Sequence, residues 1–248
     1  MTNRLLRSLP AADYEALCPL LELVTLPVGR TLCEYGGRPD HAYFPVNSIV
    51  SLLYTTQDGS TTEVGLVGND GVVGIALCLG GESMPHRAVV YLAGEAFRIR
   101  SARLVDEFAC RPSLRKHLLR YAQSFLTQIS QTAVCNRLHS VEKRLCRNLL
   151  LCHDRISSDD FLMTQDFIAT MLGGRRESVT VAAGRLQDAG LIRYTRGHIH
   201  ILDRRGLEAA ACECYRVVAC ESLRLLGMEG RSATSALRAS SSLIARSA

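Results

Sequence analysis

One stretch, residues 163–202, constrains the fold of this chain more than any other part. It reads as two short helices around a glycine turn, followed by a β-hairpin. Thr164 can cap the first helix, and Gly173-Gly174 can end it, because glycine tolerates the left-handed backbone of a tight exit. The second helix is expected over residues 175–188. Helix, turn, helix and hairpin in this order predict a winged helix-turn-helix.

The second helix has two chemically different faces. One is apolar and is expected in the core: Val179, Ala182, Ala183 and Leu186. The opposite face is polar and free to contact a partner. Arginine can pair with guanine, glutamate can accept from cytosine, and threonine can contact a thymine methyl group. From this helix and the start of the first one, we expect DNA contacts by Thr164, Gln165, Arg175, Arg176, Glu177, Ser178 and Thr180.

The hairpin adds positive charge beside this face. Two short strands meet at Thr195-Arg196-Gly197, which would place Arg193 and Arg196 on or near the tip, next to DNA phosphates. Residues 175–205 hold seven arginines and three acidic residues, whereas the whole chain carries a net charge of only +5. That concentration of positive charge indicates a polyanionic partner.

The segment resembles the DNA-binding domain of the Crp–Fnr family of bacterial transcription regulators. The matching motifs are Thr164-Gln165, Leu172-Gly173, Arg176-Glu177-Ser178-Val179 and Ala189-Gly190-Leu191-Ile192. The family often carries a second base-reading arginine five residues after the first, where this chain has Val181. The resemblance implies a regulator that reads double-stranded DNA, with a target sequence that cannot be copied from better-known members. RNA polymerase is a further partner that the resemblance allows.

The N-terminal part predicts a β-rich domain, because short alternating runs are separated by glycine turns such as Asp58-Gly59. Strands are expected over residues 23–28, 31–34, 42–44, 49–55, 62–67, 88–92 and 96–100, after a helix over residues 11–23. The region resembles the cupin-like double-stranded β-roll that forms the effector domain of the same family. The matching positions are Gly29, Tyr43-Phe44-Pro45, Gly59, Glu63-Val64, Gly68, Gly71 and Gly74.

The family resemblance, which spans about residues 17–221, implies an α+β chain in four parts. These are a β-roll with flanking helices (1–112), a long dimerisation helix and hinge (113–138), a winged helix-turn-helix (139–226) and a disordered tail (227–248). Within the last structured part, a single helix is expected over residues 204–226.

The long helix carries apolar residues at alternating steps of four and three, as in a coiled coil. The stripe consists of Leu114, Leu118, Tyr121, Phe125, Thr132 and Cys135. The resemblance implies that residues 114–135 form a homodimer interface, so that two recognition helices read a near-palindromic operator. The alternative is an amphipathic helix packed on its own domain. A hinge is expected at Asn136-Arg137, with Ser140 capping a helix over residues 141–153.

The effector is less clearly encoded. Family members that bind cyclic nucleotides hold the phosphate with a Gly-Glu pair and a later Arg-Ser or Arg-Thr pair. Here the later pair aligns with Met84-Pro85, which lacks the positive charge and one amide donor. Cyclic AMP is therefore not expected, and no cofactor is assigned. Another anionic effector and a roll without ligand remain alternatives, and the candidate effector contacts are Gly74, Gly81, Glu82, His86 and Arg87.

Other classes of protein are disfavoured. With 248 residues, 47% apolar and 21% charged, the chain can form two modest domains. It has no apolar run that could cross a bilayer and no secretory signal, so we expect a cytoplasmic protein without a membrane partner. No Ser-His-acid grouping, P-loop or zinc motif points to an enzyme, so neither a catalytic nor a metal site is expected. A sensor acting mainly through protein contacts is the alternative function.

The ten cysteines are interpreted mainly as small buried side chains. The cysteine-rich N-terminal motif of iron–sulfur relatives is absent. Cys212 and Cys214 form the tightest group, but on one continuous helix they would point about 160° apart, which is poor for a shared metal. A redox-active thiol remains an alternative at Cys33, Cys135 or Cys152.

Overall fold

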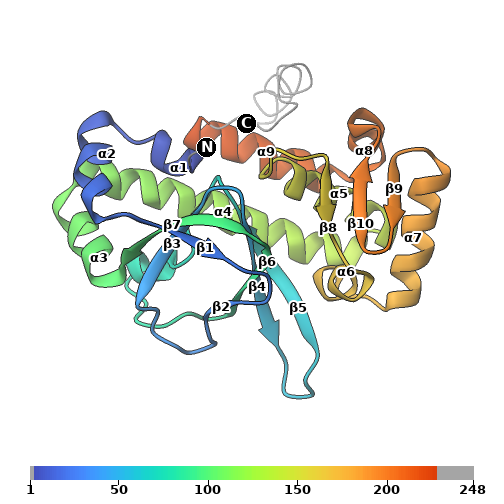
Figure 1. Cartoon of the computed structure of the whole chain (residues 1–248), viewed down its shortest axis with the longest axis horizontal. Coiled ribbons are helices and arrows are strands. Elements are labelled where there is room, and N and C mark those ends of the chain that lie inside the picture. The colour runs from blue at the N-terminus through green and yellow to red at the C-terminus, as the bar shows by residue number, and fades with distance from the viewer. Residues whose placement is uncertain (1–2, 228–248) are drawn as a thin grey trace.

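The computed structural model describes residues 3–227, and its N-terminal part is a roll of two antiparallel sheets (Figure 1). The first sheet has the order β1 (Glu22–Leu26), β7 (Gly94–Arg100), β3 (His41–Pro45). The second has the order β2 (Thr31–Cys33), β6 (Arg87–Leu92), β4 (Ile49–Thr55), β5 (Thr61–Val67). The seven expected strands are confirmed, with ends that shift by up to two residues.

Short helices flank the roll. They are α1 (Arg4–Arg7), α2 (Ala11–Leu17), the 3₁₀ turns η1 (Cys18–Leu20) and η2 (Ile75–Leu79), and α3 (Ser101–Cys110). The prediction of one helix over residues 11–23 is wrong at its C-terminal end. Pro19 lacks an amide donor, so the α-helical pattern stops at Leu17 and the chain tightens into η1 before β1.

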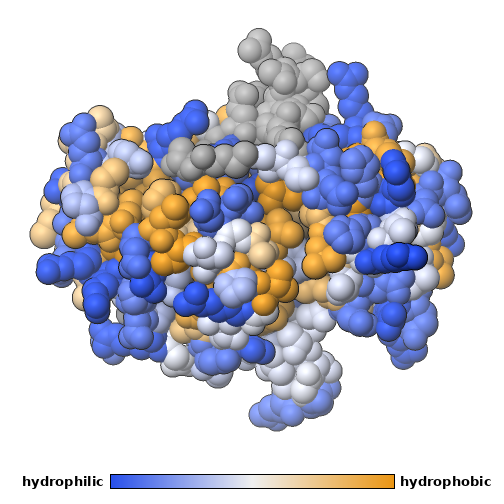
Figure 2. All heavy atoms as spheres, viewed as in Figure 1, coloured by the Kyte–Doolittle hydropathy of each residue, from blue (hydrophilic) through white to orange (hydrophobic). Residues whose placement is uncertain are grey.

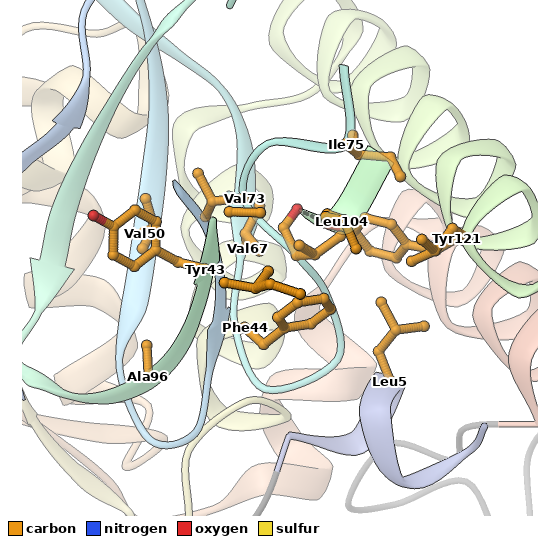
Figure 3. Packing of buried hydrophobic residues seen from close by; sticks show 14 of the residues in the cluster. Leu5, Tyr43, Phe44, Val50, Val67, Val73, Ile75, Ala96, Leu104 and Tyr121 are labelled. Carbon is orange, nitrogen blue, oxygen red and sulfur yellow. Dashed lines mark hydrogen bonds between the residues drawn. The ribbon is translucent and has the colours of Figure 1, made fainter. Parts of the chain in front are cut away.

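The core of the roll lies between its sheets and is closed by helices from both ends of the domain. Figure 3 shows Tyr43, Phe44 and Val50 from the strands, with Leu5 of α1 and Leu104 of α3 beside them. All five are at most 6% exposed. Burial of each large apolar side chain contributes about 1.5–3 kcal/mol, so this cluster supplies a substantial part of the stability of the domain.

The long helix α4 (Pro112–Leu138) crosses the molecule (Figure 1), and most of the stripe that was expected at a dimer interface packs on the roll. All six stripe residues are at most 8% exposed within the single chain. Glycines make this approach possible: a Cβ at Gly65 would lie 2.8 Å from the Phe125 ring, and one at Gly71 would overlap Tyr121. The assignment of this buried stripe to a dimer interface was therefore wrong. The alternative, packing on its own domain, is confirmed for Leu114, Leu118, Tyr121 and Phe125. Thr132 and Cys135 instead contact the C-terminal part of the chain, at Arg147 and Cys212.

A different row of α4 side chains faces solvent. Leu119, Leu126, Val134 and Leu138 are 44%, 53%, 41% and 70% exposed, respectively. The predicted hinge is also displaced. The helix continues through Asn136 and Arg137, and the break falls at His139, because the hydroxyl of Ser140 accepts from the Lys143 amide and starts the next helix.

The C-terminal part contains α5 (Val141–His153), α6 (Gln165–Leu172), α7 (Arg176–Asp188) and a three-stranded sheet. Its strands β8 (Asp160–Leu162), β10 (His198–Ile201) and β9 (Ile192–Thr195) lie in that order. Strand β8 was not expected from the sequence. This part packs on the roll: the rings of Tyr91 and Phe167 stack with centroids 3.4 Å apart, and the Tyr91 hydroxyl donates to the Leu162 carbonyl at 3.1 Å.

The expected single helix over residues 204–226 is instead two helices, α8 (Arg204–Ala210) and α9 (Glu213–Leu226), with Cys212 as the N-cap of the second. Helix α9 turns back and runs antiparallel to α4 (Figure 1). Of the predicted tail, only Gly227 belongs to the described residues, and the rest lies outside them. A search of the described helices found none that combines the length and the apolar character needed to span a membrane.

Candidate nucleic-acid interface

The residues that begin and end helices α6 and α7 form the helix-turn-helix through local contacts. The Thr164 hydroxyl accepts from the Phe167 amide at 3.3 Å and caps α6. At the other end Gly173 adopts a left-handed conformation, with φ of 56°, and releases the chain into the turn. Arg175, the predicted start of the second helix, is instead the N-cap of α7, which begins one residue later at Arg176.

Helix α7 presents the two faces expected from its sequence. Val179, Ala182, Ala183 and Leu186 are at most 4% exposed. Arg176, Glu177, Ser178 and Thr180 are exposed, and so is Val181. The helix lies at the outer end of the molecule in Figure 1, and Figure 2 shows mostly hydrophilic side chains over that end. Its polar face is therefore exposed to solvent.

The structure brings Arg176 together with the start of α6. Its Nε donates to Gln165 Oε1 at 3.2 Å, and its terminal nitrogen lies 3.5 Å from the Asp166 carboxylate. The Arg176 and Asp166 side chains are 62% and 75% exposed, so this pair contributes little to stability. These contacts hold the guanidinium at the protein surface. Because they are weak, the hydrogen-bonding edge of a guanine could replace them at little cost in free energy.

The wing lies next to the same helix start. Strands β9 and β10 pair in register from Ile192↔Ile201 to Thr195↔His198, which leaves a two-residue turn of Arg196 and Gly197 with φ of 51° and 80°. The Gly197 carbonyl accepts from the Met163 amide at 2.6 Å. Arg193 and Arg196 are both exposed. The interface thus combines the start of α6, the polar face of α7 and the arginines of the wing.

The candidate effector residues are spread around the η2 region. Gly74 has φ of 105° and caps η2, the Gly81 amide closes the turn on Ala76, and Glu82 is exposed. Arg87 is engaged elsewhere: its guanidinium lies 3.2 Å from the Glu34 carboxylate and donates to Thr31.

Two other features of this region bear on anion binding. His86 is partly buried, and its Nε2 has no hydrogen-bond partner among the described residues. Burial lowers the pKa of this imidazole, so it is a weak source of positive charge. At the position that aligns with the family's phosphate-binding arginine, the Met84 side chain is 2% exposed and belongs to the core.

Little room remains between the roll and α4. The space lined by Tyr121, Phe125 and Gln128 measures about 20 Å³, which is room for about one water molecule. Buried polar groups fill it: Arg155 pairs with Asp70 at 2.8 Å and donates to Gln128 Oε1 at 2.9 Å. In this conformation the described residues between the roll and α4 form a closed polar network around a space far smaller than a nucleotide.

The cysteines divide into two groups. Burial raises the pKa of Cys33 and of Cys152, so neither is a ready thiolate. Cys135, by contrast, lies 3.5 Å from Cys212 (sulfur to sulfur), and the hydrogen bond between the two thiols lowers the pKa of Cys212. His139 and Cys214 complete this cluster. The spacing Cys135-x₃-His139 and the Cys-x-Cys pair were the available signals, but the sequence did not show that α9 folds back onto α4.

Comparison with known proteins gives two family matches in succession. A cyclic nucleotide-binding domain matches residues 23–109, and a Crp-like helix-turn-helix domain matches residues 143–210. The chain is also 26% identical over 198 residues to the transcriptional regulator SdrP of Thermus thermophilus. That alignment covers 77% of this chain and 94% of SdrP.

Solved structures with the same fold include FixK2 from Bradyrhizobium japonicum, with a TM-score of 0.66 and 15% identity. The match covers 77% of this chain and 98% of that chain. Another is the c-di-GMP responsive global regulator CLP of Xanthomonas campestris, with a TM-score of 0.62 and 16% identity. It covers 78% of this chain and 100% of that chain. At these identities the structures show a shared fold.

Proposed function

The chain belongs to the Crp–Fnr family of transcription regulators, and from that premise we propose that it binds a near-palindromic DNA operator as a homodimer. In this proposal each protomer inserts α7 into one major groove and places its wing along the adjacent phosphates. The observation that carries the proposal is the uncovered polar face of α7 with Arg175 and Arg176 at its start.

The roles of the side chains follow from their chemistry and position. Arg176 and Glu177 lie on the exposed face of the first turn, where recognition helices of this type contact base edges. Arg193 and Arg196 lie on the wing, where they would neutralise phosphates and contribute affinity with little sequence preference. Val181 is 56% exposed on the same face. It offers a thymine methyl an apolar contact in place of the family's second arginine.

We assign the homodimer to the exposed row of α4 in place of the buried stripe. Leu119 and Leu126 are one heptad apart, and Val134 and Leu138 extend the row to the end of the helix. In the dimer, α4 of the second protomer would cover these side chains. The two helices would then form a coiled coil through the rows that are solvent-exposed in a single chain. The start of α9 lies against the end of α4, on the side of the buried Cys135.

For the effector, the side chains support a ligand other than cyclic AMP, or no ligand. The Met84 side chain occupies the core where a phosphate-binding arginine would stand, and Arg87 is already paired with Glu34. Incubation of the purified protein with cyclic AMP is expected to leave its melting temperature unchanged.

The direct test is fluorescence anisotropy with genomic duplex DNA at low salt. Wild-type protein is expected to bind, and the double variant Arg193→Ala/Arg196→Ala is expected to bind all sequences more weakly. Arg103→Ala is the matched control, because Arg103 is an exposed arginine on α3 whose ion pair within residues 3–227 is with its helix neighbour Asp106. Absence of duplex binding by the wild-type protein would refute the proposal. If changes at Arg176 and Glu177 abolished binding to a protein partner but not to DNA, the sensor alternative would replace it.

A further inference from the structure

The end of α4 and the start of α9 bring four metal-ligating side chains into one cluster. Cys135 and His139 come from the last turn of α4 and its C-cap, and Cys212 and Cys214 come from the N-cap and first turn of α9. One ligand atom from each lies within 4.8 Å of all the others. The three cysteines are buried and the histidine is partly buried. The break between α8 and α9 makes this possible, because Cys212 is no longer in helical phase with Cys214.

We propose that Cys135, His139, Cys212 and Cys214 bind one zinc ion. A tetrahedral zinc ion with Zn–S bonds of about 2.3 Å and a Zn–N bond of about 2.0 Å holds its ligand atoms about 3.5–3.8 Å apart. Two of the separations agree with this geometry: the sulfurs of Cys135 and Cys212 are 3.5 Å apart, and the Cys214 sulfur is 3.6 Å from His139 Nδ1. Three thiolates and one imidazole form a closed ligand set of the kind that structural zinc sites use.

The histidine is oriented for this role. Its Nδ1 faces the sulfur of Cys214, while its Nε2 lies 3.3 Å from the carboxylate of Glu213. A carboxylate that accepts from the outer ring nitrogen leaves the inner nitrogen unprotonated and fixes the orientation of the ring, as in the carboxylate–histidine–zinc arrangement. Glu213 is thereby a positioning residue, supplied by the same short segment as two of the ligands.

A buried positive charge lies beside the cluster. Arg147 is 2% exposed, and among residues 3–227 its guanidinium makes no described ion pair and its Nε has no hydrogen-bond partner. Zinc with three thiolates and a neutral imidazole carries a net charge of −1, which would balance this arginine in a region of low dielectric constant.

The site would connect the C-terminal part with the winged helix-turn-helix, here called the head, to the long helix α4. His139 lies at the break between α4 and α5, and α9 leads back from the head. A zinc ion bound there would cross-link two segments about 75 residues apart and limit how far the head can rotate about the break. An iron–sulfur cluster fits the spacing less well, because its irons and sulfides spread the cysteine ligands farther apart than a single ion does.

The test measures metal content of the full-length protein, produced in zinc-supplemented medium and purified with reductant and without chelator. One zinc per chain is expected by mass spectrometry of the metal, falling to a small fraction of that value in Cys135→Ser and in Cys212→Ser. Cys220→Ser is the matched control, because Cys220 lies on α9 outside the cluster, and it should retain one zinc per chain. His139→Cys should also retain zinc, since a fourth thiolate replaces the imidazole.

A second readout does not depend on how well the variants fold. Wild-type protein reconstituted with Co²⁺ is expected to show thiolate-to-cobalt charge-transfer absorption and the visible bands of tetrahedral cobalt. The proposal is overturned if reduced wild-type protein binds no zinc, or if its cobalt form lacks the thiolate band. It is also overturned by a Cys135–Cys212 disulfide in metal-free protein as isolated, or by iron and acid-labile sulfide in place of zinc.

Discussion

Truncation of Leu126 on α4 tests the corrected dimer interface. Leu126 is 53% exposed in the single chain, so a partner helix would cover about half of its surface. Complete burial of a leucine is worth about 1.5–3 kcal/mol, so the half that the dimer covers contributes about 1 kcal/mol. Because a two-fold axis repeats every contact, Leu126→Ala removes about 2 kcal/mol from association, which corresponds to a rise of about 30-fold in the dimer dissociation constant.

Sedimentation equilibrium over a range of protein concentrations measures this constant. Leu23→Ala is the matched control, because Leu23 on β1 is 52% exposed and lies on the roll away from α4. The control should dissociate as the wild type does, and operator binding by Leu126→Ala should require a higher protein concentration. The reasoning fails if the two variants have the same dissociation constant, or if the wild-type chain is monomeric at all concentrations.

Three further predictions concern the wing and the interior of the roll. Arg196→Ala should weaken binding to all DNA sequences by a similar factor. It should also reduce the slope of the logarithm of the binding constant against the logarithm of the salt concentration by about one phosphate contact, as measured by anisotropy at several salt concentrations. A loss confined to one sequence would contradict this prediction. Burial raises the pKa of Glu63 to about 8, although a hydrogen bond from Ser51 opposes this shift. Because of the raised pKa, the folded chain keeps a proton that the unfolded chain releases near pH 4.5. The stability that the protonated Glu63 confers is therefore fully present below pH 4.5 and is lost as the pH rises toward 8. Glu63→Gln should remove this loss when the free energy of unfolding is measured by chemical denaturation at several pH values. Plots of that free energy against pH that stay parallel for wild type and variant would contradict the prediction. Gly71→Ala should lower the free energy of unfolding by about 1–3 kcal/mol, because its new Cβ would overlap the Tyr121 hydroxyl, and an unchanged melting temperature would show that the packing is looser than described.

The elements that are encoded locally could be predicted from the sequence. The strands of the roll follow from alternating apolar residues between glycine turns, and the caps at Thr164 and Ser140 lie where they were expected. The two faces of α7 follow from helical periodicity alone, because an apolar side and a polar side alternate in its sequence. These features depend on residues a few positions apart in the sequence, and the observed ends of the helices and strands differ from the predicted ends by only one or two residues.

The face that α4 turns to its own roll depends on contacts far apart in the sequence. Its buried stripe has coiled-coil spacing, but a coiled coil and a helix packed on a glycine-lined sheet edge require the same periodicity. The deciding feature is the space left at Gly65 and Gly71, which Phe125 and Tyr121, 60 and 50 residues later in the chain, occupy. That complementarity is visible only once the roll has formed.

The cluster at the start of α9 was missed for a related reason. Residues 204–226 contain no proline and no strong breaker near Cys212, so helix propensity alone predicts continuity. The chain breaks there because α9 buries Tyr215, Val218 and Leu226 against the rest of the molecule, and tertiary packing outweighs the local preference. Cys135 and Cys212 then become neighbours although 77 positions separate them.

Helix α7 is proposed as the element that reads DNA sequence, and the proposed function follows from this role. Selection of bound duplexes from a random library, performed side by side for the wild-type protein and for Arg176→Ala, measures this directly. The wild type should recover a near-palindromic motif, and the variant should lose its preference at one base pair in each half-site, worth about 1–3 kcal/mol of discrimination, while it keeps the rest of the motif. Identical motifs for the two proteins, or no motif for the wild type, would contradict the account.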